Sequence, residues 1–379
     1  MIYLDNAATT YPKPCDVTAA VMRCIRDFGG NPGRGSHRLS MLAAECVYDC
    51  REAAADFFGL ADPSRVVFTM NTTYALNMAV KCTLRTGDHV LMGNMEHNSV
   101  RRPLEKLARD GVIRCDVFNA YGDVATVLSD LQKQLRANTR AVVCAHTSNI
   151  CNRTAPIREI GGFCRSHGIC FIVDGAQSAG IQAVDLGKMP VDIYCVPGHK
   201  GLYGPQGCGM MLVCGDPFLS ESTLIEGGSG VHSLDSHMPH ELPERFEAGT
   251  LPTPAIAGLA AGIHWVKSLG VNEIHRHECA LWHKLYGELR NLSDVILYDE
   301  TPGAVLLFNV TGRSPAEVAS ALDGEGICVR SGLHCAPMAH SVLGTGENGA
   351  VRVSFGAMNT EKEVRCFADT LYRIVRAKK

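Results

Sequence analysis

Residues 191–213 read VDIYCVPGHKGLYGPQGCGMMLV, and this stretch decides the fold. The apolar run at residues 193–196 predicts a buried strand, which ends at Pro197 and Gly198. A second apolar run, at residues 210–213, predicts a strand that returns into the core. Between the two strands the chain turns through several glycines. It presents Lys200 at the tip of the turn, where a bound group can approach the backbone closely.

Lys200 admits two interpretations. A lysine in a hairpin is most often a solvated surface residue, and for Lys200 taken alone this is the simpler interpretation. A lysine that is partly withdrawn from water disfavours its ammonium form, and its free amine can form a Schiff base. The rest of the chain decides between the two.

Strands and helices alternate ahead of this stretch. We expect strands at residues 66–69, 89–92, 113–118, 141–145 and 169–173, and helices at residues 72–84, 100–110, 124–135 and 157–167. Short apolar runs between amphipathic helices indicate strands that are buried on both faces of a largely parallel sheet. The fold class is therefore α/β.

The C-terminal part has a different pattern. Two long helices, at residues 254–269 and 271–292, precede strands at 305–310 and 351–355 and a closing helix at 360–376. This order indicates a smaller α+β unit. At 379 residues the chain exceeds one ordinary core. We expect a large domain over residues 15–255 and a small domain made of residues 1–14 and 256–379.

Composition limits the class of function. The chain is 46% hydrophobic and 20% charged, with a formal net charge of -3, so nothing favours binding to nucleic acid or an anionic membrane. No apolar window is long enough to span a bilayer, and the N-terminal residues do not resemble a signal peptide. These features predict a cytoplasmic globular protein.

Seventeen cysteines are a high number for such a chain. Most of them lie in apolar runs, where cysteine behaves as a small core residue. No CxxC pair occurs, and Cys46 and Cys50 have no second pair, so we expect no metal site. The thiols are expected to be reduced.

Polar motifs follow the predicted strands. They are NTT at residues 71–73, EHN at 96–98, TSN at 147–149, DGAQ at 174–177 and GHK at 198–200. Because loops at the carboxyl ends of parallel strands gather at one edge of a sheet, we expect these motifs to converge on one site.

Asp174 directly follows an apolar strand. A carboxylate there can pair with the protonated ring nitrogen of pyridoxal phosphate, although a helix cap is an equally simple interpretation. Thr73 opens a helix, where backbone N–H groups favour a phosphate. His97 could stack on a flat ring, although loop histidines are more often solvated.

The segment RSGLHCAP at residues 330–337 is the least generic. It places Cys335 on a glycine-containing loop with Arg330 and His334 beside it, and a nearby cation favours the thiolate. One more cysteine among many is the plain alternative. Arg352 lies in the strand VRVSF, where a guanidinium could bind a carboxylate in bidentate fashion or make a surface ion pair.

Taken together, these motifs resemble one family. LDNAATT, MEHNSVRRP, HTSNICN, VDGAQSAG, GHKGLYGPQG, RFEAGT and RSGLHCAP occur in the order typical of class V aminotransferases, and more closely of their cysteine desulfurase branch with a short cysteine loop. The resemblance extends from Tyr3 to the last helix. It implies the pyridoxal-phosphate-dependent transferase fold of type I.

The resemblance also implies roles around the cofactor ring. Lys200 would form the Schiff base with pyridoxal 5'-phosphate and act in catalysis. His97 would stack on the ring, Asp174 would pair with the ring nitrogen, and Gln177 would donate a hydrogen bond to the ring hydroxyl.

Further residues would bind the phosphate. Thr73 and His199 would contact it, with Thr72 beside them, and Thr250 would reach it from a second subunit. Family members are homodimers with shared sites, so the RFEAGT turn would serve the partner's site.

The substrate residues follow in the same way. Asn149 and Arg352, with Arg330, would bind the substrate carboxylate, and Cys335 would be the catalytic nucleophile. The implied reaction converts L-cysteine to L-alanine and leaves a persulfide on Cys335, which an acceptor protein then takes, for example in iron–sulfur cluster assembly.

Three alternatives stay open. The same loop accepts selenium, so the chain could be a selenocysteine lyase. The scaffold also serves aminotransferases and β-lyases. Outside enzymology, the chain could be a sulfur-carrier partner or a regulator that uses the pyridoxal phosphate fold.

Two positions depart from the family pattern. The residue three before the lysine is usually serine or threonine, whereas here it is Pro197, which has neither a hydroxyl nor an N–H group. Gly201 is an additional residue between Lys200 and the Tyr-Gly-Pro segment. Pro197 therefore predicts the loss of one phosphate contact.

Overall fold

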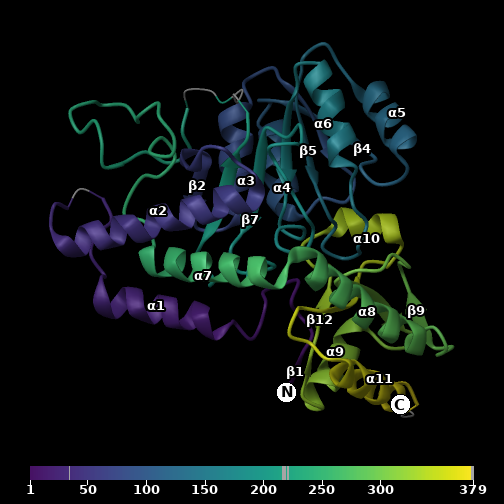
Figure 1. Cartoon of the computed structure of the whole chain (residues 1–379). Helices are drawn as coiled ribbons and strands as arrows, with labels where there is room; N and C mark the ends of the chain where they lie inside the picture. Colours follow the sequence, from purple (N-terminus) through teal and green to yellow (C-terminus); the bar gives the residue numbers. More distant parts are fainter. Residues whose placement is uncertain (34, 216–218, 220–221, 377–379) are drawn as a thin grey trace.

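A seven-stranded sheet organises the larger part of the molecule (Figure 1). The computed structural model describes residues 1–33, 35–215, 219 and 222–376. The strand order of the large sheet is β2-β8-β7-β6-β5-β3-β4. These strands are β2 (Val66–Thr69), β3 (His89–Gly93), β4 (Arg114–Phe118), β5 (Thr139–Ala145), β6 (Cys170–Asp174), β7 (Ile193–Pro197) and β8 (Gly209–Val213).

The sheet is parallel apart from β8, which runs antiparallel to both of its neighbours. β7 and β8 are the two strands expected on either side of Lys200. Side chains alternate along β7: Ile193 and Cys195 pack into one core and Tyr194 and Val196 into the other. The predicted sheet, buried on both faces, is therefore confirmed.

Helices cover both faces of this sheet. One face packs against α3 (Thr72–Thr83) and α4 (Asn98–Arg109). The opposite face packs against α2 (Arg38–Phe58), α5 (Val124–Gln134), α6 (Ile157–Ser166) and α7 (Thr253–Leu269). A side chain at the start of a helix often satisfies its free N–H groups, and Asn71 does so for α3 by accepting a hydrogen bond from the Tyr74 N–H.

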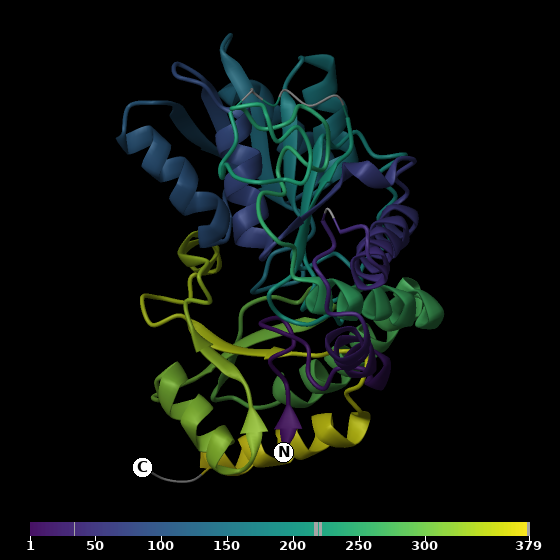
Figure 2. The same cartoon turned by 90° about the vertical axis from the view of Figure 1, so that its left-hand side faces the viewer.

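A smaller antiparallel sheet lies below the large one in Figures 1 and 2. Its order is β12-β13-β10-β9, and three helices pack around its core. The elements are β9 (Val295–Leu297), β10 (Val305–Val310), β12 (Arg330–Gly332), β13 (Ala350–Ser354), α8 (Val271–Leu289), α9 (Pro315–Gly324) and α11 (Glu361–Arg376). We propose that the two sheets mark the two expected domains, 15–255 and 1–14 with 256–379.

The N-terminal arm belongs spatially to the small sheet. β1 (Ile2–Tyr3) pairs in parallel with β11 (Ile327–Cys328), and the two lie side by side in Figure 2. After β1 the arm passes between the two sheets, and α1 (Cys15–Asp27) then packs against α7, which also contacts α2. The arm is thus placed to contact side chains from both sheets.

The inward face of α1 differs from the expected one. An apolar stripe containing Val17, Val21, Ile25 and Phe28 is predicted by helical spacing. Val17 and Cys24 are the buried residues of α1, whereas Ile25 is 64% exposed. No helix among the described residues is both long and apolar enough to cross a membrane.

Candidate active site

A cavity of about 230 Å³ opens at the carboxyl ends of the parallel strands. Its walls come from the loops after β2, β3, β5, β6 and β7, together with the arm and β12 and β13. Ten of the twelve predicted site residues line it: Thr72, Thr73, His97, Asn149, Asp174, Gln177, His199, Lys200, Arg330 and Arg352. The predicted convergence of the loops is therefore confirmed.

Lys200 lies at the base of this cavity. Burial lowers the pKa of Lys200 to about 8; Asp174 opposes this shift, whereas Arg352 and Arg330 add to it. The arm holds the backbone here, because the Thr10 N–H and the Lys13 Nζ donate to the His199 carbonyl at 3.1 and 2.8 Å. The interpretation of Lys200 as a solvated surface lysine is wrong.

The residue after the lysine has to be small. A Cβ atom at Gly201 would lie 2.2 Å from the carbonyl oxygen of Ala179, which is shorter than any tolerable contact. This close approach packs the Lys200 turn against the segment that follows Asp174. The additional glycine noted in the sequence is thus required by backbone packing.

Asp174 is the last residue of β6 and is only 4% exposed. Its Oδ1 accepts a hydrogen bond from the Ala176 N–H at 2.9 Å, and residues 175–192 contain no helix, so the helix-cap interpretation is wrong. Burial raises the pKa of Asp174, and Lys200 opposes this rise. A cationic partner in the cavity would favour the carboxylate form.

His97 ends the loop after β3 and caps α4. Its Nδ1 accepts from the Ser99 N–H at 3.1 Å and lies 2.8 Å from Ser99 Oγ, which in turn lies 2.7 Å from Thr73 Oγ1. Burial, and then the charge of Lys200, lowers the pKa of His97 to about 4, so the ring is neutral near pH 7. Ser99 is not predicted from the sequence, although it also lines the cavity.

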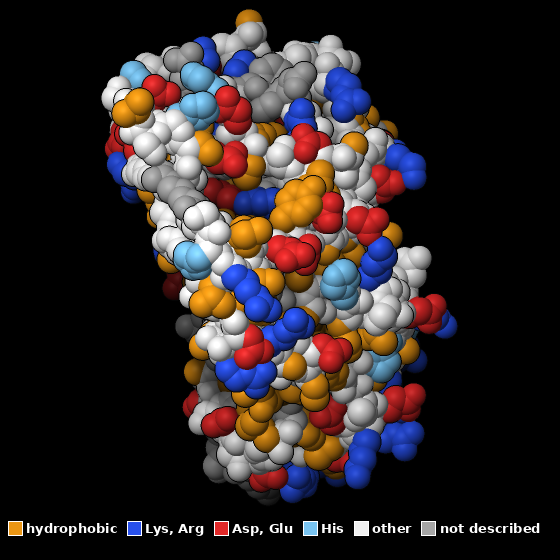
Figure 3. All heavy atoms as spheres, turned by 60° about the vertical axis from the view of Figure 1, so that its left-hand side comes forward, with side chains coloured by type: hydrophobic (Ala, Val, Ile, Leu, Met, Phe, Trp, Pro, Cys, Tyr) orange, Lys and Arg blue, Asp and Glu red, His pale blue; other side chains and the backbone are white. Residues whose placement is uncertain are grey.

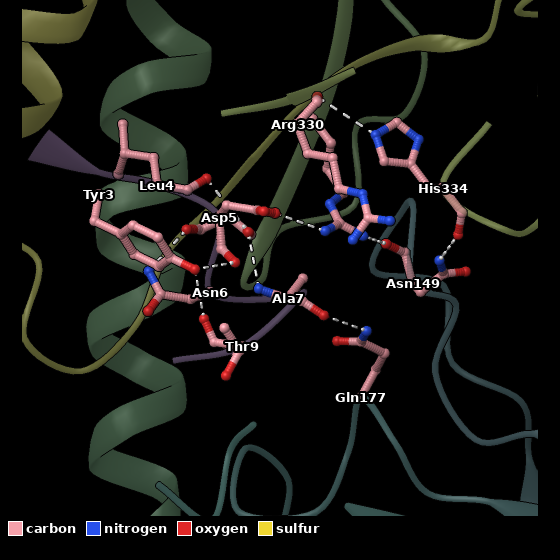
Figure 4. A network of polar contacts seen from close by, with 12 residues as sticks. Tyr3, Leu4, Asp5, Asn6, Ala7, Thr9, Asn149, Gln177, Arg330 and His334 are labelled. Carbon is pink, nitrogen blue, oxygen red and sulfur yellow. Dashed lines mark hydrogen bonds and ion pairs between the residues drawn. The ribbon is translucent and has the colours of Figure 1, made fainter. Parts of the chain in front are cut away.

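Arg352 lies on β13, directly opposite Arg330 on β12, and is only 2% exposed. Its Nη1 donates to the Asn149 carbonyl and its Nη2 to Asp5 Oδ1, both at 2.9 Å (Figure 4). The buried Nε has no partner. The guanidinium is therefore fixed from two sides and retains donors for a ligand.

Gln177 and Asn149 connect the cavity wall to other segments. Gln177 Nε2 donates to the Ala7 carbonyl of the arm at 3.0 Å, and Asn149 Nδ2 donates to the His334 carbonyl at 2.9 Å (Figure 4). The side chain of Asn149 is thus engaged by the cysteine loop, while its backbone holds Arg352.

Cys335 is exposed and does not itself line the cavity, whereas its neighbour His334 does. Both residues have positive φ, 50° at His334 and 56° at Cys335, in the loop between β12 and α10 (Pro337–Leu343). Non-glycine residues adopt this conformation rarely and at a cost. The Cys335 carbonyl accepts from the Asn98 N–H at 2.7 Å, which joins this loop to the start of α4.

Thr250 lies away from the cavity within this chain. It lines a separate hollow of about 590 Å³ together with Arg51 and Glu247, and it accepts a hydrogen bond from Asn31 Nδ2 at 3.3 Å. Glu247 forms a buried ion pair with Arg51 and accepts from the Phe68 N–H, which fixes the 245–250 turn. A single chain does not bring Thr250 to the cavity of Lys200.

The cavity residues fit pyridoxal phosphate. They supply an amine with a lowered pKa, a buried carboxylate, a neutral imidazole and hydroxyls at the start of α3. Thr72 Oγ1 and His199 Nδ1 are buried without hydrogen-bond partners, as expected for atoms that await a ligand. Pro197 also lines the cavity and contributes no donor.

Comparison with known proteins identifies the protein family. The family model "Aminotransferase class-V" matches residues 2–367, and the chain belongs to this family. The resemblance drawn from the seven motifs is therefore confirmed. Among curated proteins, the chain is 33% identical to a "Probable cysteine desulfurase" of Methanothermobacter thermautotrophicus, over 98% of this chain and 94% of that protein.

Other relatives agree. The chain is 32% identical to a "Cysteine desulfurase" of Salmonella agona, over 99% of this chain and 94% of that protein. The apo structure of a cysteine desulfurase from Thermococcus onnurineus superimposes with a TM-score of 0.91 at 34% identity, covering 100% of this chain and 95% of that one. These likenesses confirm the type I fold predicted for pyridoxal-phosphate-dependent transferases.

Proposed function

We propose that this chain is a pyridoxal-phosphate-dependent cysteine desulfurase that converts L-cysteine to L-alanine and takes the sulfur onto Cys335. The observation that carries the proposal is the placement of a buried lysine in the cavity with a cysteine loop at its rim. Full-length relatives named cysteine desulfurase support it.

Nine residues would hold the cofactor and substrate. Pyridoxal phosphate, when bound, withdraws electrons from the substrate carbon. Asp174 would pair with its ring nitrogen, Gln177 would donate to its hydroxyl and His97 would cover its face. The hydroxyls of Thr72 and Thr73, with His199, would bind the phosphate, and the substrate carboxylate would take the free N–H groups of Arg352, with Asn149 and Arg330 beside it.

Lys200 would then handle the proton. An amine whose pKa is about 8 exists in both protonation states near neutral pH, so it can accept a proton from the substrate α-carbon and later return one. Arg352 and Arg330 favour the neutral amine because they repel a further positive charge.

Cys335 would carry out the sulfur transfer. Its thiolate forms a bond to the substrate sulfur while the carbon–sulfur bond breaks, and the electron pair of that bond passes to carbon. Protonation of this carbon yields L-alanine, and the transferred sulfur stays on Cys335 as a persulfide. Because Cys335 is exposed, an acceptor thiol can approach it and take the outer sulfur by exchange.

We also propose a homodimer in the cytoplasm. Exposed apolar side chains of α1 and α2 support it: Met22, Ile25, Met41 and Tyr48 are each more than half exposed. Figure 3 shows apolar side chains among charged ones over the face to which these helices belong. Thr250, which does not reach the cavity of its own chain, would complete the partner's phosphate site.

An assay of products tests the function. Purified protein supplied with pyridoxal phosphate, L-cysteine and a thiol reductant should release L-alanine and sulfide in equal amounts. Lys200→Ala should abolish the reaction and the visible absorbance of the cofactor, whereas Cys335→Ala should abolish the reaction and keep that absorbance.

Other results would overturn the proposal in distinguishable ways. Pyruvate in place of alanine would indicate a β-lyase, and turnover of L-selenocysteine alone would indicate a selenocysteine lyase. Retention of the cysteine rate in Cys335→Ala would reject the nucleophile. Failure of the purified protein to bind pyridoxal phosphate would exclude every proposed function that uses this cofactor.

Mixing two inactive variants tests the shared site. In a dimer of a Lys200→Ala chain and a Thr250→Val chain, one site keeps both intact residues. The mixture should therefore regain activity that neither variant has, after unfolding and refolding together. No recovery would place Thr250 outside the partner's site.

A further inference from the structure

Three buried side chains form a continuous hydrogen-bonded chain behind the cysteine loop. His334 Nδ1 lies 3.0 Å from His340 Nε2, and His340 Nδ1 lies 2.7 Å from Thr345 Oγ1. The other nitrogen of His334, Nε2, lies 3.4 Å from the Arg330 carbonyl. His334, His340 and Thr345 are 5%, 1% and 7% exposed, respectively. His340 and Thr345 do not line the cavity.

The contacts determine where each proton lies. A carbonyl oxygen only accepts, so His334 Nε2 must carry a hydrogen, and Nδ1 of the neutral ring is then an acceptor. His340 Nε2 must therefore donate to it, which leaves His340 Nδ1 as the acceptor of the Thr345 hydroxyl proton. Thr345 Oγ1 also lies 3.5 Å from the His340 carbonyl, but the 2.7 Å contact with Nδ1 is the shorter, and the hydroxyl proton is assigned to it. Each of the three contacts of the two rings then has one donor and one acceptor.

A charge on His334 would disrupt the hydrogen-bonded chain. Protonation of His334 adds a hydrogen to Nδ1, which would then face the Nε2–H of His340 across the 3.0 Å contact. Protonation of His340 adds a hydrogen to its Nδ1, so the Thr345 hydroxyl would have to accept there and turn its own proton toward the His340 carbonyl, 3.5 Å away. Burial and the nearby Arg352 disfavour the charged forms: the pKa of His334 is lowered to about 2 and that of His340 to about 4. Arg330 also faces His334 and acts in the same sense through its charge.

The hydrogen-bonded chain stabilises a backbone conformation that is otherwise unfavourable. Two successive non-glycine residues, His334 and Cys335, have positive φ, a backbone conformation that such residues adopt rarely and at a cost in free energy. The His334 ring is tied to α10 through His340, and its carbonyl accepts from Asn149. The side chain and the backbone of His334 are therefore held from two directions, next to the nucleophile.

We propose that His340 and Thr345 are positioning residues that keep His334 neutral and protonated on Nε2 and thereby hold the Cys335 loop in its reactive conformation. This inference rests on the proposed function, because it takes Cys335 as the nucleophile. Neither residue touches the substrate or the cofactor; both act through His334.

Variants at Thr345 separate the hydrogen bond from side-chain volume. Thr345→Val removes the hydroxyl at nearly constant volume, whereas Thr345→Ser keeps it. Ser341→Ala is the matched control, because Ser341 lies beside His340 on α10 and is exposed, and its hydroxyl donates only to the Pro337 carbonyl among its described contacts. A thermal melt of each variant loaded with pyridoxal phosphate establishes that it is folded.

Two measurements test the hydrogen-bonded chain directly. Nitrogen-15 NMR of histidine-labelled protein should show both rings neutral and protonated on Nε2 at pH 7. Thr345→Val should add an Nδ1-protonated population, and Thr345→Ser should not. Alkylation of Cys335 by iodoacetamide, followed by mass spectrometry, should change in rate in Thr345→Val alone.

Turnover should follow the same pattern. Displacement of a reacting atom by about 1 Å can cost on the order of a hundredfold in rate. Thr345→Val should thus lower kcat by roughly tenfold to a hundredfold, with KM for L-cysteine and the cofactor absorbance nearly unchanged. Thr345→Ser and Ser341→Ala should keep the wild-type kcat.

Specific results would overturn the inference. A charged or Nδ1-protonated ring in the wild type would refute the proton assignment. An unchanged kcat and alkylation rate in Thr345→Val would refute the positioning role. Activity retained in Cys335→Ala would instead reject the proposed nucleophile and leave the proton assignment to stand on the NMR result.

Discussion

Arg352 Nη2 lies 2.9 Å from Asp5 Oδ1, so the arginine proposed to bind the substrate is held by a carboxylate from the N-terminal arm. The arginine is 2% exposed and the aspartate side chain 21%. Tyr3 steadies the arm here, because its hydroxyl donates to the Thr9 carbonyl at 2.9 Å (Figure 4). The pair joins the arm just after β1 to β13.

Removal of this carboxylate should destabilise the protein. Asp5→Ala leaves the guanidinium of Arg352 buried without its ionic partner, which typically costs about 3–5 kcal/mol. Urea unfolding should show this loss in the free energy of unfolding. Asp16→Ala, which removes an exposed aspartate from the same end of the chain, should change it little. Equal losses in the two variants would contradict the proposed burial cost.

The lysine should react with the cofactor at unusually low pH. Only the neutral amine attacks an aldehyde, and burial lowers the pKa of Lys200 from 10.5 to about 8. The rate at which cofactor-free protein captures pyridoxal phosphate, followed by absorbance, should therefore rise as pH increases through about 8. Lys200→Ala serves as the blank for other lysines. A midpoint near 10.5 would contradict the lowered pKa.

Glu96 should make the protein less stable at high pH. Burial raises the pKa of Glu96 from 4.5 to about 8, and one of its oxygens, Oε2, has no partner. A carboxyl whose pKa is higher in the folded state favours folding most below its unfolded pKa, and the contribution is lost as pH rises through the folded one. Relative to Glu96→Gln, the wild type should lose stability between about pH 4.5 and about pH 8 and then level off.

Unfolding titrations at several pH values check this difference. A difference between wild type and Glu96→Gln that stays constant with pH would mean that Glu96 titrates normally.

A hydroxyl at position 197 should strengthen cofactor binding. Pro197 lines the cavity at the end of β7 without a donor, and a hydrogen bond to a charged group contributes about 1.5–3 kcal/mol. Pro197→Ser should lower the Kd for pyridoxal phosphate by roughly tenfold or more, measured by absorbance titration of cofactor-free protein. Pro197→Ala controls for loss of the ring, and an equal Kd in the two variants would exclude the hydroxyl as the cause.

The sequence predicts the large sheet well because its signal is strong. A strand buried on both faces, such as β7, is apolar at nearly every position, whatever it pairs with. The strands β9, β11 and β12 have only two or three residues and depend on their partners. Local pattern therefore does not show them, nor does it show that Arg330 lies opposite Arg352.

The site is predicted in part for a similar reason. Lys200 and Asn149 follow strands and Asp174 ends one, and parallel strands bring their carboxyl ends together. Asp5 is missed, because nothing local connects it to Arg352, which is 347 positions away. The exposure of Ile25 is also missed, since helical spacing identifies an apolar face and not what covers it.

The contacts of the arm with β13 limit the order in which the two parts of the site can form. Asn6 Nδ2 donates to the Ser354 carbonyl, a contact between residues 348 positions apart. During synthesis the first residues leave the ribosome long before their partners on β13 exist. The large sheet can assemble beforehand, but Arg352 gains its carboxylate only when nearly the whole chain is available. Nascent chains that lack the last strand should therefore have a lysine ready for the cofactor and no completed place for a substrate.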